Sequence, residues 1–210
     1  MKDRFRERII SGDRTGIETL TREALGQGVQ VETIVHQYLM PAMEEVGRRY
    51  EEGEFFIPEM LMAARTMQAS MLVLKPLIVG SNVRTAGRIV IGTVEGDLHD
   101  IGKSLVAMML EGAGFEVHDL GVDVKPERFV ETVRNVKPCM VAMSALLTTT
   151  IPVMQTTIEA LKRAGLRDSV VVMVGGAPLT PQYAASIGAD GYAEDAAAAA
   201  RKAKELLDVA

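Results

Sequence analysis

The fold is decided by residues 88–111, Arg-Ile-Val-Ile-Gly-Thr-Val-Glu-Gly-Asp-Leu-His-Asp-Ile-Gly-Lys-Ser-Leu-Val-Ala-Met-Met-Leu-Glu. The apolar run 88–94 predicts a buried strand, and residues 103–111 predict a helix. A loop flanked by Gly96 and Gly102 joins the two. Such a strand, loop and helix in succession is where an α/β sheet presents ligand-binding groups.

This loop carries His99 between Asp97 and Asp100. A nearby carboxylate can fix the tautomer of an imidazole and raise its basicity, which is how metal-ligating histidines are usually supported. The loop therefore indicates a metal or cofactor site at His99.

Composition limits the class of protein. The 210 residues are enough for one large domain or two small ones with a real core. The formal net charge is −5 with interspersed signs, which disfavours a nucleic-acid partner. The single cysteine, Cys139, lies in an apolar run and indicates a small buried residue in a reducing, cytoplasmic compartment. The charged N-terminus and the lack of an apolar stretch of about 20 residues predict a protein that is neither secreted nor membrane-embedded.

Residues 1–80 have helical periodicity throughout, which predicts an antiparallel four-helix bundle. Asp13 is placed to cap the second helix, and Pro58 lies near the first position of the fourth. Pro41, inside the third, should bend that helix or remove a hydrogen bond. The predicted helices are Arg4–Ile10, Asp13 to about Leu25, about Val31–Glu52, and Phe56 through Leu74.

A short polar segment, residues 81–87, predicts an interdomain linker, and residues 88–210 then alternate between strand and helix patterns. Continuous apolar strands indicate burial on both faces, as in a parallel sheet. The pattern predicts a Rossmann-like (flavodoxin-like) parallel five-stranded α/β domain with a ligand site along the carboxyl ends of the strands. The predicted strands are Arg88–Val94, Phe115–Leu120, Cys139–Ser144, Val170–Val174 and Asp190–Tyr192, and the helices are Ile101–Glu111, Pro126–Asn135, Ile151–Ala164, Thr180–Ile187 and Asp195–Leu207.

Polar residues and glycines follow several strand ends. Each group alone is more often structural, because a Ser/Thr run can cap a helix and a glycine pair can form a tight turn. Their common placement on one sheet edge favours a shared ligand. Neither His36 nor His118 has a cysteine or histidine at zinc-ligand spacing, and no Gly-x-Gly-x-x-Gly or Walker sequence is present. The strand-end groups are Asp97, His99 and Gly102, then Ser144 through Thr150, then Gly175 and Gly176.

The joint pattern is Asp97-x-His99-x-x-Gly102, Ser144-x-Leu146 and Gly175-Gly176. On an α/β domain preceded by a helical bundle, it resembles the cobamide-binding module of corrinoid proteins. These are the methyl carriers of methanol, methylamine and methoxy-compound methyltransferase systems, and the module recurs in cobalamin-dependent methionine synthase. The resemblance covers nearly the whole chain, including Gly53–Ala64, which is similar to the start of the family's last bundle helix.

The resemblance implies a cobamide (cobalamin or a related corrinoid) bound base-off, with its nucleotide tail in the α/β domain and His99 as the lower axial ligand of cobalt. Asp97 would accept the other imidazole N–H, and Thr150, where methionine synthase has a serine, would bond Asp97 in turn. Asp100 is assigned as a helix cap. The remaining implied cofactor-binding residues are Gly102, Ser144, Leu146, Thr148, Gly175, Gly176 and Tyr192.

Two roles are implied for particular parts of the chain. Gly175 and Gly176 would lack side chains because the nucleotide tail passes close to their backbone. The bundle would cover the upper face of the corrin, because Co(I) is oxidised by air and a methyl group on Co(III) is light-sensitive. The cap candidates are Phe56, Leu61, Met62 and Met67, and packing in the bundle core is the default interpretation for any one of them. Catalysis would require the cap to move, with the linker as a hinge.

The resemblance implies a carrier that cycles between Co(I) and methyl-Co(III) and is not catalytic alone. Its implied partners are a substrate:corrinoid methyltransferase, a corrinoid:tetrahydrofolate or corrinoid:thiol methyltransferase, and a reductive activator. One alternative is the cobamide-binding subunit of an adenosylcobalamin-dependent mutase, which shares the Asp-x-His-x-x-Gly pattern but not the bundle. Another is a cobalamin-sensing regulator, which would need a DNA-binding segment. The sequence does not distinguish the methyl donor, the acceptor, the lower base of the cobamide or the oligomeric state.

Overall fold

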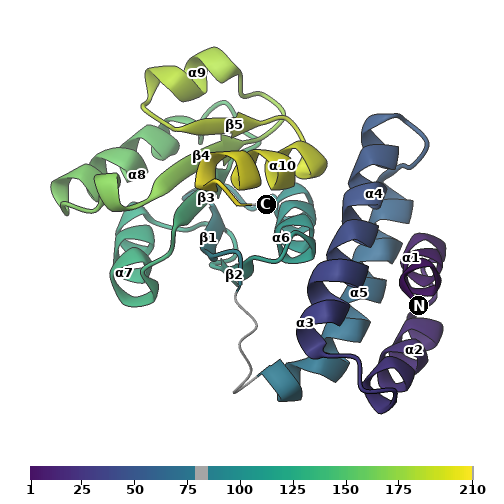
Figure 1. Cartoon of the computed structure of the whole chain (residues 1–210). Coiled ribbons are helices and arrows are strands. Elements are labelled where there is room, and N and C mark those ends of the chain that lie inside the picture. Colours follow the sequence, from purple (N-terminus) through teal and green to yellow (C-terminus); the bar gives the residue numbers. More distant parts are fainter. Residues whose placement is uncertain (79–84, 210) are drawn as a thin grey trace. The chain divides into compact units, whose positions relative to one another are not determined.

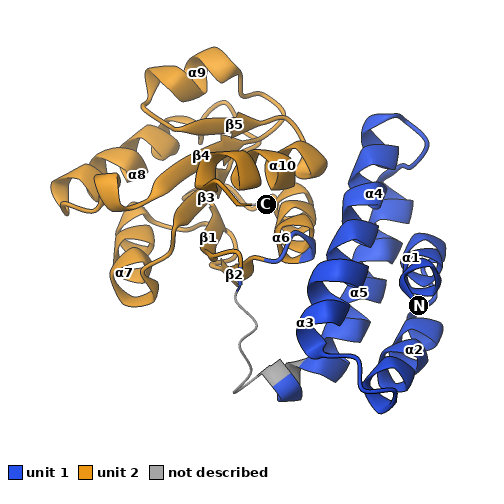
Figure 2. Ribbon diagram, viewed as in Figure 1, with its two compact units in different colours: residues 1–85, 112–114 blue, residues 86–111, 115–210 orange. Residues whose placement is uncertain are grey.

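The computed structural model describes residues 1–78 and 85–209, which form two compact units (Figure 1; Figure 2). One unit comprises residues 1–85 and 112–114, and the other comprises residues 86–111 and 115–210. The first is helical and the second is an α/β unit, as predicted. Residues 81–84 of the predicted linker lie outside the described residues. In the described part of the chain, no helix is long and apolar enough to cross a membrane.

The helical unit is a bundle whose helices begin at the predicted signals. Asp13 caps the second helix, and its carboxylate accepts the backbone N–H of Gly16 at 2.8 Å. Pro58 lies in the first turn of the last helix, where its missing N–H costs little. The elements are α1 (Lys2–Ser11), α2 (Arg14–Gly26), α3 (Val31–Thr33), the π-helical segment η1 (Ile34–Leu39), α4 (Met40–Glu51) and α5 (Ile57–Ile78).

The third predicted helix contains a wider turn directly before Pro41. In η1 the backbone hydrogen bonds span five residues, as between the N–H of Met40 and the carbonyl of Val35. Proline has no N–H with which to continue the α-helical pattern. The local change predicted at Pro41 is therefore a π-helical turn, and α3, η1 and α4 follow one another as a single helical segment.

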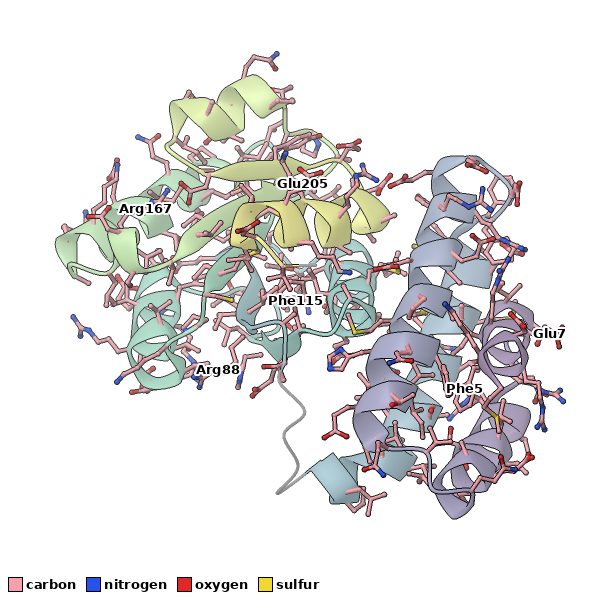
Figure 3. The ribbon with its side chains drawn as sticks, in the orientation of Figure 1. Phe5, Glu7, Arg88, Phe115, Arg167 and Glu205 are labelled. Atoms are coloured by element: carbon pink, nitrogen blue, oxygen red, sulfur yellow. The ribbon has the colours of Figure 1, made fainter. Side chains whose placement is uncertain are left out.

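The bundle core includes Phe5, which is labelled in Figure 3. Phe5 and Ile9 of α1 are fully buried, and the Phe5 ring lies 5.3 Å from the ring of Tyr38. Full burial of one such apolar side chain contributes roughly 1.5–3 kcal/mol. Two buried hydroxyls also meet in this core, because Thr21 on α2 and Ser70 on α5 lie 2.7 Å apart and satisfy each other.

An acid-sensitive cluster of charges lies on α4. Glu45 accepts hydrogen bonds from Arg48 and Arg49, each at 2.9 Å, and these bonds lower the pKa of Glu45 from near 4.5 to about 2. A lowered carboxylate pKa stabilises the folded state above the unfolded value, and this contribution is lost as the pH falls from about 4.5 toward 2. Because the Glu45 side chain is 17% exposed, we expect screening to reduce the contribution to about 1 kcal/mol.

Unfolding of the wild type and Glu45→Gln across the acid range tests this expectation. The two proteins should differ by about 1 kcal/mol near neutral pH and converge toward about pH 2. Glu18→Gln is a suitable control, since it removes a more exposed pair with Arg22 at 3.5 Å and should change little. A stability difference between wild type and Glu45→Gln that persists at low pH would contradict this account.

The α/β unit contains a five-stranded parallel sheet in the order β2-β1-β3-β4-β5. Its central strands are apolar and buried, and in β1 all residues except Arg88 are buried. The strands are β1 (Arg88–Thr93), β2 (Glu116–Asp119), β3 (Met140–Ser144), β4 (Val171–Gly175) and β5 (Gly191–Ala193). The helices are α6 (Ile101–Gly112), α7 (Pro126–Val136), α8 (Pro152–Arg163), the 3₁₀ turn η2 (Arg167–Ser169), α9 (Pro181–Ser186) and α10 (Ala196–Leu207).

Helices cover both faces of this sheet (Figure 1). On one face, Phe129 of α7 and Ile158 of α8 share a buried cluster with Val90 of β1. Ile89 and Ile91 flank Val90 in the strand, so they point to the opposite face, where they are also buried. Figure 1 shows α6 and α10 on that second face. The doubly wound fold predicted from the sequence is therefore correct.

The register of the sheet aligns the strand ends at one edge. Thr93 pairs with Ser144, Ser144 with Gly175, and Gly175 with Ala193. Val94, predicted as the last residue of the first strand, instead forms an isolated bridge with Val124. The loops that follow β1, β3 and β4 consequently leave the sheet side by side, which brings the predicted site residues to the same edge.

Candidate functional site

The predicted histidine–aspartate pair lies in the loop between β1 and α6. Nδ1 of His99 is 2.8 Å from Oδ1 of Asp97, and the same oxygen accepts the backbone N–H of His99 at 3.0 Å. Asp97 is fully buried, whereas the His99 side chain is 51% exposed. Because the ring is held through Nδ1, its other nitrogen, Nε2, is the one left to bind a metal.

The second oxygen of Asp97 binds the loop after β3. Oδ2 accepts the N–H of Leu146 at 2.7 Å, the N–H of Leu147 at 3.3 Å and the hydroxyl of Thr150 at 2.8 Å. Burial raises the pKa of Asp97, but the hydrogen bonds from Leu146, His99 and Thr150 outweigh it and hold the pKa well below the usual aspartate range. Asp97 is therefore an ionised carboxylate that ties two neighbouring loops together.

Thr150 makes the hydrogen bond that was predicted for it. Its hydroxyl lies 2.8 Å from Asp97 and 2.9 Å from the carbonyl of Leu147, and the charged oxygen is the stronger acceptor. The methyl group of Thr150 lies against Gly96, where an added Cβ would be 3.4 Å from it. The space would therefore admit a Cβ, and the φ of 81° is what favours glycine at this position.

The glycine pair after β4 has a reason within the protein itself. A Cβ on Gly176 would lie 1.9 Å from the carbonyl oxygen of Ala145, and the φ of Gly176 is 144°. A Cβ on Gly175 would lie 2.9 Å from the carbonyl oxygen of Ala193. The family resemblance implied that both glycines make way for a passing ligand, but the backbone of β5 and of the loop after β3 already requires them.

Three further predicted residues lie along the same edge. Ser144 ends β3 and is half-buried, and Thr148 is exposed in the following loop. Tyr192 of β5 is half-buried and donates its hydroxyl to the carbonyl of Leu179 at 3.3 Å, and burial raises its pKa. Contact between these residues and a cofactor remains a prediction.

Large apolar side chains are exposed in the two loops that Asp97 joins. Leu98 is 73% exposed and Ile101 77%, and Leu146 and Leu147 are each 41% exposed. Exposed apolar side chains gathered in this way are typical of a binding surface.

Gly102, in the first turn of α6, lies next to this apolar surface. A Cβ added there would meet no heavy atom of the described residues within 4 Å, so the packing does not explain this glycine. Among residues 1–78 and 85–209, no three His, Cys, Asp or Glu side chains form a group that could hold a metal ion. The edge offers one metal-binding nitrogen within an apolar surface, which suits a metal already held in a flat organic ring.

The four cap candidates in the helical unit differ in burial. Phe56, just before α5, and Met62 within α5 are exposed, and Leu61 is half-buried. Met67 is buried, so it packs within the bundle core and presents almost no surface to a ligand.

The histidine loop is also supported by residues that the sequence pattern did not indicate, among them Thr93 and Asp123. Thr93 is fully buried and donates its hydroxyl to the carbonyl of His99 at 2.9 Å. Asp123, in the loop after β2, has a φ of 54° and accepts the N–H of Gly96 at 2.7 Å. In the sequence, Thr93 could have been noticed as a single hydroxyl residue in an apolar strand. Asp123 has no such sequence signal and is identified only by its position in the fold.

Asp100 lies at the position predicted for a helix cap, directly before α6. Its carboxylate binds Lys103 at 2.9 Å, and this bond lowers the pKa of Asp100. Its carbonyl accepts the N–H of Ser104 at 2.8 Å. Asp97, and not Asp100, is the partner of the imidazole, as the resemblance implied.

Known proteins resemble this chain along nearly its whole length. Two family models, both described as B12 binding domain, match residues 1–75 and 87–201. The dimethylamine corrinoid protein of Methanosarcina barkeri is 48% identical over 200 residues, which cover 95% of this chain and 93% of that protein. A cobalamin-binding protein from Desulfitobacterium hafniense DCB-2 has a TM-score of 0.78 at 33% identity, with 98% of both chains covered. A chain of the methanol:cobalamin methyltransferase complex MtaBC from Methanosarcina barkeri has a TM-score of 0.88 at 29% identity, covering 98% of this chain and 78% of that chain.

Proposed function

This chain belongs to the B12-binding corrinoid proteins of methyltransferase systems, and we propose that it holds its cobamide base-off, with Nε2 of His99 as the lower axial ligand of cobalt. It is a methyl carrier that works with a partner methyltransferase and is not catalytic alone. The half-exposed imidazole, fixed through Nδ1 by a buried carboxylate, supports the proposed ligation.

The residues of the edge fit a corrin ring and its tail. Leu98, Ile101 and Leu146 offer apolar surface beside the axial nitrogen, and Gly102 leaves space over the first turn of α6. The proposed tail-binding residues along the strand ends are Ser144, Thr148, Gly175, Gly176 and Tyr192.

The bound cobamide supplies the cobalt centre that accepts and releases the methyl group. The chain itself keeps the imidazole in one tautomer, because Asp97 holds the proton at Nδ1 and leaves the lone pair of Nε2 for the metal. Thr150 and the backbone N–H of Leu146 keep the Asp97 carboxylate ionised. With a cobamide bound, the hydrogen bond from Nδ1 to Asp97 would make the imidazole a more basic ligand for cobalt.

An apolar cap over the methyl-carrying face belongs to the same proposal. Phe56, Leu61 and Met62 have the exposed or half-exposed apolar surface that such a cap needs to exclude water. Met67 would support them from the bundle core.

We also propose a methylamine as the class of methyl donor. Identity to the dimethylamine corrinoid protein is 48%, against 29% to the chain of the methanol complex. The proposal includes a second methyltransferase, acting on tetrahydrofolate or a thiol, because a carrier must pass on its methyl group. It also includes a reductive activator and a cytoplasmic location, because a carrier must recover from oxidation in reducing surroundings.

Anaerobic reconstitution with hydroxocobalamin tests the axial role of His99. In protein labelled with ¹⁵N-histidine, the wild type should give a histidine-ligated absorption spectrum and, in the Co(II) form, a doublet splitting of the EPR signal by the histidine nitrogen, and His99→Ala should lose both. His118→Ala is the control, because His118 is paired with Glu116 at 2.9 Å on β2 and should leave the spectra unchanged. Identical spectra for the wild type and His99→Ala, or no binding by the wild type, would refute the proposal.

A further inference from the structure

Lys103 is a buried cation beside the histidine loop. It lies in the first turn of α6, and its side chain is 1% exposed. Its ammonium is 2.9 Å from Oδ1 of Asp100 and also binds Oδ2 of Asp119. A buried ammonium is costly unless it is paired and hydrogen-bonded, so Lys103 keeps both carboxylates close as long as it stays buried.

These two carboxylates belong to different parts of the α/β unit. Asp100 directly follows His99 in the chain. Asp119 is the last residue of β2, and its other oxygen accepts the N–H of Gly121 at 2.8 Å. Lys103 therefore ties the C-terminal end of the histidine loop to the neighbouring strand.

The N-terminal end of the same loop is tied to the same neighbour. Asp123 accepts the N–H of Gly96 at 2.7 Å, and the N–H of Asp123 donates to the carbonyl of Asp97 at 3.0 Å. The loop that carries His99 is thus anchored at both ends to β2 and the segment after it. The carboxylate of Asp97 adds a third anchor, to the loop after β3.

We propose that Lys103, through Asp119 and Asp100, is a positioning group that determines where His99 presents Nε2 to the cobamide. This inference rests on the proposed axial role of His99 and assigns a part in it to a residue that is not hydrogen-bonded to the imidazole. Charge-assisted hydrogen bonds are about twice as strong as neutral ones, and in the link from Lys103 to Asp119 both partners are charged groups. Without it, residues 98–101 are released on their C-terminal side, and the ring reaches the metal-binding orientation less often.

Asp119→Asn is the decisive variant, because it keeps the shape of the side chain and lies outside the histidine loop. Its amide oxygen can still accept from Gly121, but the charged link to Lys103 is lost. Glu116→Gln is the matched control, since it removes a negative charge from the same strand at a residue paired with His118. Lys103→Met, alone and combined with Asp119→Asn, completes a double-mutant cycle.

The first measurement is amide hydrogen exchange in the protein without cobamide. The N–H of His99 donates to Asp97 and that of Ser104 to the carbonyl of Asp100, so both report on the loop. Asp119→Asn should accelerate their exchange by about tenfold or more, while the N–H of Val172, bound to Asp190 at 2.7 Å, stays unchanged. Exchange of these amides in Glu116→Gln should match that in the wild type. In the double variant, exchange should be no faster than in Lys103→Met.

The second measurement is the histidine-ligated fraction after loading ¹⁵N-histidine-labelled protein with hydroxocobalamin, read from the doublet splitting of the Co(II) EPR signal. Asp119→Asn should lower this fraction several-fold relative to Glu116→Gln. Wild-type exchange at His99 and Ser104 in Asp119→Asn would overturn the inference, as would a uniform acceleration that includes Val172, because either result means that the link does not act on this loop. The exchange result does not depend on the cofactor. It therefore distinguishes a failure of Lys103 to hold the histidine loop from a failure of His99 to ligate cobalt.

Discussion

Replacing Asp97 by asparagine is expected to lower the free energy of unfolding by about 2–4 kcal/mol and to release the histidine from its fixed orientation. Both oxygens of Asp97 face donors, since Oδ1 accepts the N–H of His99 and Oδ2 accepts the N–H of Leu146 and the hydroxyl of Thr150. An asparagine has one acceptor oxygen, and its NH₂ group would face the donors on the other side. The donors on one side of residue 97 would then be buried without an acceptor. This costs more free energy than the loss of an exposed hydrogen bond.

Urea unfolding of the protein without cobamide measures this loss. Asp123→Asn is the matched control on the same edge, because its amide oxygen can still accept the N–H of Gly96 and asparagine tolerates the φ of 54°. We expect this control to change stability by less than about 0.5 kcal/mol. Equal stability of Asp97→Asn and Asp123→Asn would mean that the loop after β3 does not depend on the carboxylate.

Gly176→Ala is expected to destabilise the α/β unit by roughly 3–5 kcal/mol, or to prevent its folding. The new Cβ would lie 1.9 Å from the carbonyl oxygen of Ala145, which must move, and the φ of 144° is strained for alanine. Ala145 directly precedes Leu146, whose N–H binds Asp97. A shift of this backbone would therefore also disturb the support of His99, more than 70 residues earlier in the chain.

Gly102→Ala provides the contrast, because a Cβ there meets open space in a helical turn. Alanine is favoured over glycine in a helix, so the protein without cobamide should become more stable by about 0.5–1 kcal/mol. The same variant should bind hydroxocobalamin more weakly if the space is reserved for the cofactor. Thermal unfolding and a binding titration measure the two effects, and a large stability loss in Gly102→Ala, or none in Gly176→Ala, would contradict these assignments.

The elements of the fold could be predicted from local signals. Alternating and continuous apolar runs placed every strand to within one residue at each end, and Asp13 and Pro58 marked helix starts correctly. Pro41 predicted a local disturbance, but periodicity could not say that the helix would widen into a π turn. That choice depends on which hydrogen bonds the neighbouring residues can still make.

The sequence predicted that the site residues lie on one edge of the sheet. It did not predict the structural reason for each residue at its position. The bond from Thr150 to Asp97 was implied by the family resemblance and is confirmed. Lys103 and Asp123 were missed because each is paired with a residue of another element, Lys103 with Asp119 of β2 and Asp123 with Gly96 of the histidine loop. Sequence pattern does not reveal contacts between separate elements. Gly176 was attributed to a ligand for the same reason, since only the fold shows how close the carbonyl of Ala145 lies.

The bonds of Asp97 also have a consequence for the order of events during synthesis. The partners of its Oδ2 lie 49 and 53 residues further along the chain, at Leu146 and Thr150. When the loop of His99 leaves the ribosome, these partners do not yet exist, and the carboxylate cannot bind them until β3 has paired with β1. The full support of Asp97 therefore follows the assembly of the sheet, so a nascent chain stalled before Leu146 should hold the contact between Asp97 and His99 without the bonds to the loop after β3.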